Sequence, residues 1–131
     1  GSGLFSPQNN GLMVRSVGGS RTIANPISLD SNVTFLGDDS NPGVENLVFT
    51  GPVTLTGDRT LLTMDPTQTV TFAGAIGEGI FANRVLNKNG RGTLEFTAAN
   101  TYSGATTVND DGGTLVLSGA GSLLNISTLT V

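Results

Sequence analysis

Carboxylates are the side chains of this sequence with the most obvious capacity for chemistry. The 131 residues include no His and no Cys, which excludes imidazole bases, thiolate nucleophiles and the usual zinc ligands. Two carboxylates could still cleave a glycosidic bond, so a polysaccharide-cleaving enzyme is the enzymatic alternative. The ten acids are Asp30, Asp38, Asp39, Glu45, Asp58, Asp65, Glu78, Glu95, Asp110 and Asp111. Most lie among turn-forming residues, where Asp caps main-chain amides, so we expect no catalytic residue, no cofactor and no enzymatic activity.

Two acidic turns also offer the hard oxygen ligands that calcium prefers. They are Asp38-Asp39-Ser40-Asn41 and Asn109-Asp110-Asp111-Gly112. Neither matches an EF-hand loop or the glycine-rich nonapeptide calcium repeat. We therefore expect no required metal, and keep as calcium candidates Asp38, Asp39, Asp110 and Asp111.

The cations are few and dispersed. There are six Lys and Arg residues against ten acids, and the net charge is −4. The densest cationic group is Arg84, Lys88 and Arg91. Nucleic-acid binding and attraction to an anionic membrane both need a basic surface, so neither is expected. The sequence contains no apolar run of 18 residues, so we expect no membrane-spanning helix and no direct membrane insertion.

The elements that would position these groups are short β-strands. Abundant Thr and 19 Gly oppose helix formation. Segments such as Val33-Thr34-Phe35, Val53-Thr54-Leu55 and Val70-Thr71-Phe72 alternate apolar residues with Thr, which puts the apolar side chains on one face of a strand. Gly, Asn, Asp and Pro fill the intervals, as expected of turns.

Two all-β architectures fit this pattern. An antiparallel β-sandwich has half-buried alternating strands, and Asn89-Gly90 could form one of its hairpin turns. A parallel β-helix has the same alternation, with coils of about twenty residues stacked so that like residues lie over like. Val33 and Val53 are 20 residues apart, and Leu94 and Leu115 are 21 apart. This recurrence favours the solenoid, while the alternation and the Asn-Gly step favour the sandwich.

The segment from Leu86 to Gly119 closely resembles the autotransporter-associated β-strand repeat, also called the passenger-associated transport repeat. Asn-Thr-Tyr-Ser-Gly, then Thr-Thr-Val and Gly-Thr-Leu-Val-Leu, is its most specific part. The residues that carry the likeness are Gly92, Thr93, Leu94, Phe96, Asn100, Thr101, Tyr102, Ser103, Gly104, Thr106, Thr107, Val108, Gly113, Thr114, Leu115, Leu117 and Gly119.

The segment also departs from the repeat. Glu95 and Phe96 replace the usual Thr and Leu, and Asp110-Asp111 looks like an insertion in a turn. We expect Glu95 to point outward. Tyr102 is the only Tyr, and we expect it to pack across a corner with its hydroxyl in water.

The resemblance implies a right-handed, single-stranded parallel β-helix of about six rungs. Residues 1–3 look like a cloning scar, 4–24 would form a cap or an irregular N-terminal segment, and 25–131 would form the rungs, with the repeat motif at 86–119. The chain is expected to be a fragment of a longer passenger.

The resemblance further implies a non-catalytic segment of a passenger in type V secretion, outside or on the surface of a Gram-negative-type bacterium. Because no ATP is available outside the outer membrane, folding rung by rung could drive export. The expected partners are neighbouring rungs of the same polypeptide. End-to-end self-association, through exposed strand edges, and a host or matrix glycan or protein are further candidates. Adhesion or glycan binding is the alternative function.

Overall fold

The computed structural model describes residues 3–4, 11–37, 45–109, 111, 113–124 and 129–131. Its regular elements are short β-strands. They are β1 (Leu12–Arg15), β2 (Arg21–Ile23), β3 (Ile27–Leu29), β4 (Val33–Leu36), β5 (Leu47–Phe49), β6 (Val53–Leu55), β7 (Arg59–Thr63), β8 (Thr69–Phe72), β9 (Ile76–Gly77), β10 (Leu86–Asn89), β11 (Thr93–Phe96), β12 (Thr106–Val108), β13 (Thr114–Leu117) and β14 (Leu129–Thr130). None of the described segments is a helix long and apolar enough to cross a membrane.

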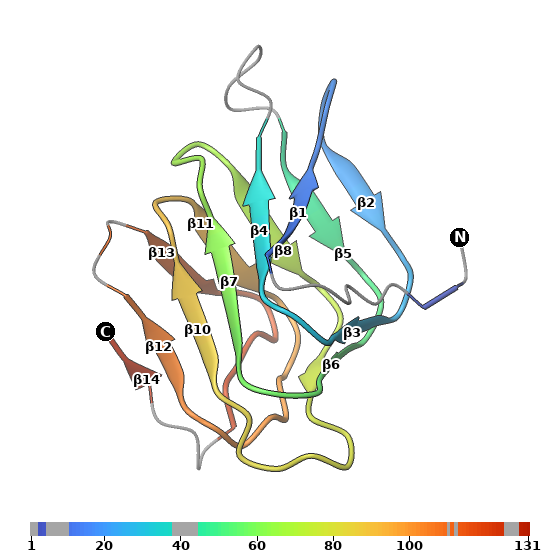
Figure 1. Ribbon diagram of the computed structural model, residues 1–131, viewed down its shortest axis with the longest axis vertical. Coiled ribbons are helices and arrows are strands. Elements are labelled where there is room, and N and C mark those ends of the chain that lie inside the picture. Colours follow the sequence, from blue (N-terminus) through green and yellow to red (C-terminus); the bar gives the residue numbers. More distant parts are fainter. Residues whose placement is uncertain (1–2, 5–10, 38–44, 110, 112, 125–128) are drawn as a thin grey trace.

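The strands form three parallel sheets that wrap around one core. A six-stranded sheet has the order β1-β4-β7-β10-β12-β14, a five-stranded sheet the order β13-β11-β8-β5-β2, and a three-stranded sheet the order β3-β6-β9. In Figure 1 the strands β1, β4, β7, β10 and β12 lie side by side and point the same way. The chain visits the sheets in rotation, which makes a β-solenoid of about 5 turns. The solenoid prediction is confirmed, and the antiparallel sandwich is wrong.

The period-2 alternation builds the core. In β4, β5 and β6 the first and third residues are buried and the middle one is half-buried, as the sequence predicts. Phe residues of successive turns stack along the axis: the ring centroids of Phe49 and Phe72 lie 5.0 Å apart, and Phe96 meets Phe72 edge-on at 6.2 Å. Phe35 closes the group from the six-stranded sheet, 5.8 Å from Phe49.

The length of a turn differs from the expected twenty residues. Leu94 stacks on Leu115, as their spacing predicts. Val33, Val53 and Val70, however, lie in three different sheets, so their spacing does not measure a turn. The pairing of Val33 with Leu61 gives one turn of 28 residues, and that of Leu86 with Thr106 gives another of 20. Longer turns explain why the chain makes about 5 of them rather than six.

The parallel ladder starts earlier than residue 25. β1 pairs with β4 from Leu12 to Arg15, and β2 pairs with β5 from Arg21 to Ile23. The segment expected to form a cap therefore contributes two strands to the first turn.

Candidate functional site: the repeat turns and the polar corner

The expected repeat motif forms the fourth and fifth turns of the solenoid, here called the repeat turns (residues 86–119). Leu94 and Phe96 of β11 are fully buried and stack on Val70 and Phe72 of β8. On their other side β11 pairs residue for residue with β13. The motif thus repeats because each copy adds one layer to the same core.

Asn100 joins three successive turns. Its side-chain Oδ1 accepts a hydrogen bond of 2.9 Å from the main-chain N–H of Ile76, one turn before. Its Nδ2 and its own main-chain N–H both donate to the carbonyl of Ser122, one turn after, each at 3.1 Å. The three-stranded sheet ends at β9 in the described chain, so this buried amide takes over the bonding that a strand would provide.

Tyr102 is buried at the next corner, and its hydroxyl is not in water. The hydroxyl makes a 2.6 Å hydrogen bond with Oγ1 of Thr106, and both residues are about 1% exposed. Burial raises the pKa of Tyr102 to about 12, although the hydrogen bond with Thr106 opposes the shift. The expectation of a hydroxyl in water is wrong, because the hydroxyl is bonded to the buried Thr106 instead.

Glycines of the motif let adjacent turns approach. A Cβ on Gly104 would lie 2.2 Å from the carbonyl oxygen of Arg84, and one on Gly92 would lie 2.5 Å from that of Asp65. A Cβ on Gly113 would meet both the Gly90 carbonyl oxygen, at 2.0 Å, and Nζ of Lys88, at 2.5 Å. These positions require Gly because the obstructing atoms are largely main chain.

Ser103 fastens a loop of the previous turn to the repeat turns. Its hydroxyl donates to Oε1 of Glu78 and accepts a 3.1 Å hydrogen bond from the main-chain N–H of Asn83. Glu78 Oε2 accepts a further bond from the main-chain N–H of Arg84. Burial acts to raise the pKa of Glu78, but the hydrogen bonds from Ser103 and Arg84 outweigh it and lower that pKa.

The outward residues of the repeat turns are tied across turns as well. Glu95 points outward as predicted, and its two oxygens accept hydrogen bonds from the hydroxyls of Thr71, at 3.1 Å, and Ser118, at 2.6 Å. Thr69, Thr93 and Thr114 lie over one another in register. Of the motif residues not yet placed, Thr101, Thr107 and Gly119 lie outside the buried core, whereas Val108, Leu115 and Leu117 line its partly open C-terminal end.

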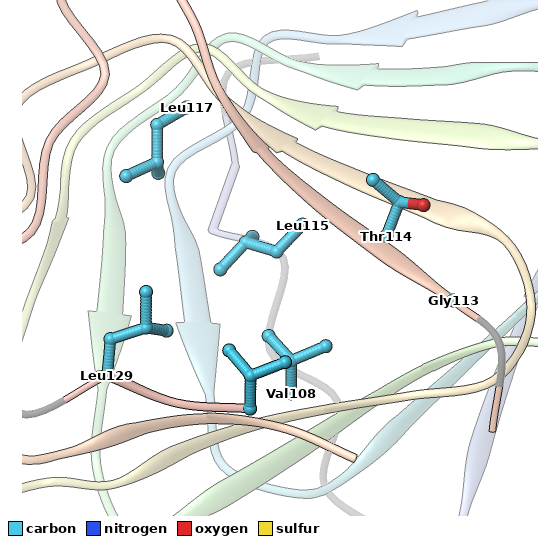
Figure 2. Close-up of a pocket in the computed structure, with 7 residues that line it drawn as sticks. Val108, Gly113, Thr114, Leu115, Leu117 and Leu129 are labelled. Carbon is cyan, nitrogen blue, oxygen red and sulfur yellow. The ribbon is translucent and has the colours of Figure 1, made fainter. Parts of the chain in front are cut away.

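The core is partly open at the C-terminal end. Leu115 and Leu117 stack on Leu94 and Phe96, yet Leu117 is 42% exposed because β13 is the edge strand of its sheet in the described chain. Figure 2 shows Leu115 and Leu117 with Val108 and Leu129 facing a common space. These side chains face inward, but no further layer covers them in the part of the chain that the structure describes.

Lys88 lies inside the solenoid rather than on its surface. It pairs between Leu61 and Val108 on the inner face of β10, and it is 1% exposed. Its Nζ donates to the carbonyl oxygens of Asn89 and Gly90, at 2.9 and 2.6 Å. Burial lowers the pKa of Lys88, and nearby Asp111 opposes that shift. Of the three cations that lie close together in the sequence, Lys88 therefore adds no charge to the protein surface.

Lys88 belongs to a set of buried polar side chains that sequence reasoning missed. They gather where the chain passes from the six-stranded to the five-stranded sheet, a region here called the polar corner. Its members are Ser16, Glu45, Thr63, Gln68 and Lys88. Strand parity could have found them: Glu45 lies two residues before buried Leu47, and Gln68 two before buried Val70. Because these side chains are polar, the sequence instead suggested that they lie in turns.

The predicted calcium turns can be assessed only at Asp111. Asp38, Asp39 and Asp110 lie outside the described residues. The Asp111 carboxylate accepts a hydrogen bond from the main-chain N–H of Gly90. Among the residues that the structure describes, no three acidic side chains form a cluster that could hold a metal ion by themselves.

Other acids brace corners. Oδ1 of Asp30 accepts hydrogen bonds from Ser28 and Thr56, at 2.7 and 2.8 Å. Asp58 accepts one from the main-chain N–H of Val85, and Asp65 accepts one from that of Thr67.

Comparison with known protein families matches residues 86–117 to the passenger-associated-transport-repeat. The match begins with β10 and ends with β13, so it covers the strands of the repeat turns. It confirms the resemblance found in the sequence. Searches of curated proteins and of solved structures found no match to the chain.

Proposed function

We infer that this chain is a structural segment of an autotransporter-type passenger, because a passenger-associated-transport-repeat forms two turns of its solenoid. Such a segment would be secreted or displayed on the surface of a Gram-negative bacterium. We propose that its role is to support export by folding turn upon turn, and to act as a non-catalytic scaffold.

The observation that carries this proposal is the residue-for-residue stacking of the repeat turns. β11 pairs with β8 on one side and with β13 on the other, in the same register throughout. A folded turn therefore offers the next one a ready edge and an apolar surface, as Leu115 and Leu117 do at β13. Each added turn would release free energy by burying that surface, which makes a backward step costly.

The bonding of the described acids supports a scaffold over an enzyme. Asp30, Asp58, Asp65, Glu78 and Glu95 each accept hydrogen bonds that hold a corner or join two turns. A glycosidase needs two carboxyl groups facing one cleft. These acids instead serve the stacking itself.

The test is to remove one whole turn from the complete polypeptide that carries this segment. Deleting residues 86–105 joins Val85 to Thr106, which occupies the same register as Leu86. The expected result is reduced display on the cell surface relative to total protein, measured by protease accessibility in intact cells.

A second one-turn deletion serves as the matched control. Deleting residues 33–60 also preserves register, because Val33 pairs with Leu61, but it leaves the repeat intact. If both deletions reduce display equally, solenoid length rather than the repeat governs export. Unchanged display after deletion of 86–105 would overturn the export role.

A further inference from the structure

Three polar side chains of the polar corner point into the solenoid from three successive turns. Ser16 follows β1, Glu45 precedes β5 and Gln68 precedes β8, each in step with the inward-facing residues of its strand. Their exposed fractions are 1%, 2% and 2%. All three are therefore core positions occupied by oxygen-bearing side chains.

Hydrogen bonds to the Leu36 carbonyl and from the Gln68 amide link these three residues. The Leu36 carbonyl oxygen accepts from the main-chain N–H of Ser16, at 3.4 Å, and from Nε2 of Gln68, at 3.1 Å. The same Nε2 also donates to the carbonyl oxygen of Glu45, at 2.8 Å. Because Nε2 of Gln68 donates to two carbonyl oxygens, Oε1 is the atom of this amide that remains to accept a hydrogen bond or bind a cation.

Four buried side-chain oxygens at this corner accept no hydrogen bond from the described residues. They are Ser16 Oγ, Glu45 Oε1, Glu45 Oε2 and Gln68 Oε1. A carboxylate withdrawn from water is costly unless it is paired with a cation or hydrogen-bonded. Lys88, the buried cation of the corner, instead donates to the carbonyls of Asn89 and Gly90.

We propose that Ser16, Glu45 and Gln68 bind a calcium ion inside the polar corner. The ligand set is all oxygen: a carboxylate, an amide carbonyl and a hydroxyl, with no nitrogen or sulfur that would favour a transition metal. Calcium accepts irregular geometry and bidentate carboxylates, whereas magnesium demands a near-octahedral site. A single carboxylate places the site in the low-affinity class of extracellular calcium modules, at about 10⁻⁴ to 10⁻³ M. None of these three residues belongs to the acidic turns singled out in the sequence.

Equilibrium dialysis of the whole chain against radioactive calcium tests the proposal. We expect one ion per chain at millimolar calcium, and a rise in the midpoint of thermal unfolding when EDTA is replaced by calcium. The E45Q variant keeps the side-chain volume but removes the charge, and it should weaken calcium binding about tenfold or more. In EDTA, E45Q should unfold at or above the wild-type temperature, because the uncompensated carboxylate is gone.

Two further variants keep the test decisive. E95Q makes the same change on the outer surface and should leave calcium binding unaltered. S16A removes one ligand oxygen with little change in volume and should weaken binding, so the test does not depend on the folding of E45Q alone. The absence of bound calcium in the wild type, or undiminished affinity in E45Q, would overturn the proposal. So would loss of binding in a D38N/D39N variant with E45Q unaffected.

Discussion

At the scale of single residues, the buried polar members of the motif, Asn100, Tyr102 and Thr106, satisfy one another or join successive turns. Asn100 supplies an acceptor to the turn before it and a donor to the turn after it. Tyr102 and Thr106 satisfy each other where water cannot reach. Such groups stabilise a fold only when all their partners are present, because an unpaired buried polar group costs about 1–3 kcal/mol. The residue type at each of these motif positions therefore depends on the hydrogen-bond donors and acceptors around it.

Tyr102 should make stability fall in alkaline solution. Its pKa is about 12 in the fold, above the value near 10 of an exposed Tyr. The unfolded chain therefore loses this proton first, and stabilisation that is complete below pH 10 is lost as pH rises toward 12. The loss should approach about 3 kcal/mol in the free energy of unfolding, measured by urea titration.

The Y102F variant is the control for this effect. It should lose about 1 kcal/mol at neutral pH, because the Thr106 hydroxyl is left without its partner. It should lack the additional decline above pH 10, and the contribution of Lys88 cancels in the comparison because both proteins contain it. With one Tyr and no Trp, the absorbance of the phenolate reports the titration directly. A midpoint near 10 in the folded protein would contradict the buried hydroxyl.

At the scale of elements, the corners between strands restrict the residue types more than the strands do. The strands need only an alternation of apolar and polar residues, which many residue types can provide. The corners need main chains to pass within contact, and there the motif has Gly92, Gly104 and Gly113. The same corners hold the polar side chains that join one turn to the next.

A G104A substitution tests the tightest of these corners where the obstruction is wholly main chain. The new Cβ would lie 2.2 Å from the carbonyl oxygen of Arg84, which cannot move without shifting the turn below. We expect a loss of about 2–3 kcal/mol in the free energy of unfolding, measured by urea denaturation. In the control G77A, the Cβ would meet only the hydroxyl of Thr101, at 3.1 Å, so the loss should be smaller. Equal losses in the two variants would show that contact with the main chain of the neighbouring turn does not determine the cost at Gly104.

At the scale of the whole molecule, the solenoid is a stack in which each turn contacts mainly its neighbours. Such a stack gains stability turn by turn, and its ends have unpaired edges. Here one end leaves Leu117 and Leu129 about half exposed. Addition of a further turn and end-to-end association would use the same edge.

Removal of a whole turn should therefore leave a folded solenoid. The isolated chain lacking residues 86–105 should retain its β circular dichroism and unfold cooperatively, with an m-value lower by roughly a seventh. Removal of half a turn, residues 93–102, should abolish folding, because later strands would arrive at the wrong sheet. If the whole-turn deletion also fails to fold, the stack is not modular, and reduced display of that variant would report instability.

The fold was largely predictable from the sequence, but the site only in part. Alternation identified β4, β6 and β8, and the spacing of Leu94 and Leu115 matched a real turn. The sequence analysis misjudged the length of a turn because Val33-Thr34-Phe35 and Val53-Thr54-Leu55 have the same alternating pattern. They lie in different sheets of one turn, so the interval between them is not the length of a turn. Local pattern specifies which side of a strand is buried, whereas register between turns depends on corners of varying length.

What the sequence determined by itself is the alternation, the turn residues and the repeat at Leu86–Gly119, since each is a property of neighbouring residues. What only the tertiary structure decided is which distant residues meet. The burial of Lys88 between Leu61 and Val108, and the linking of Ser16, Glu45 and Gln68 through the Leu36 carbonyl and the Gln68 amide, arise between turns. The physical reason is that these contacts join residues about one turn or more apart, so no local pattern of side chains encodes them.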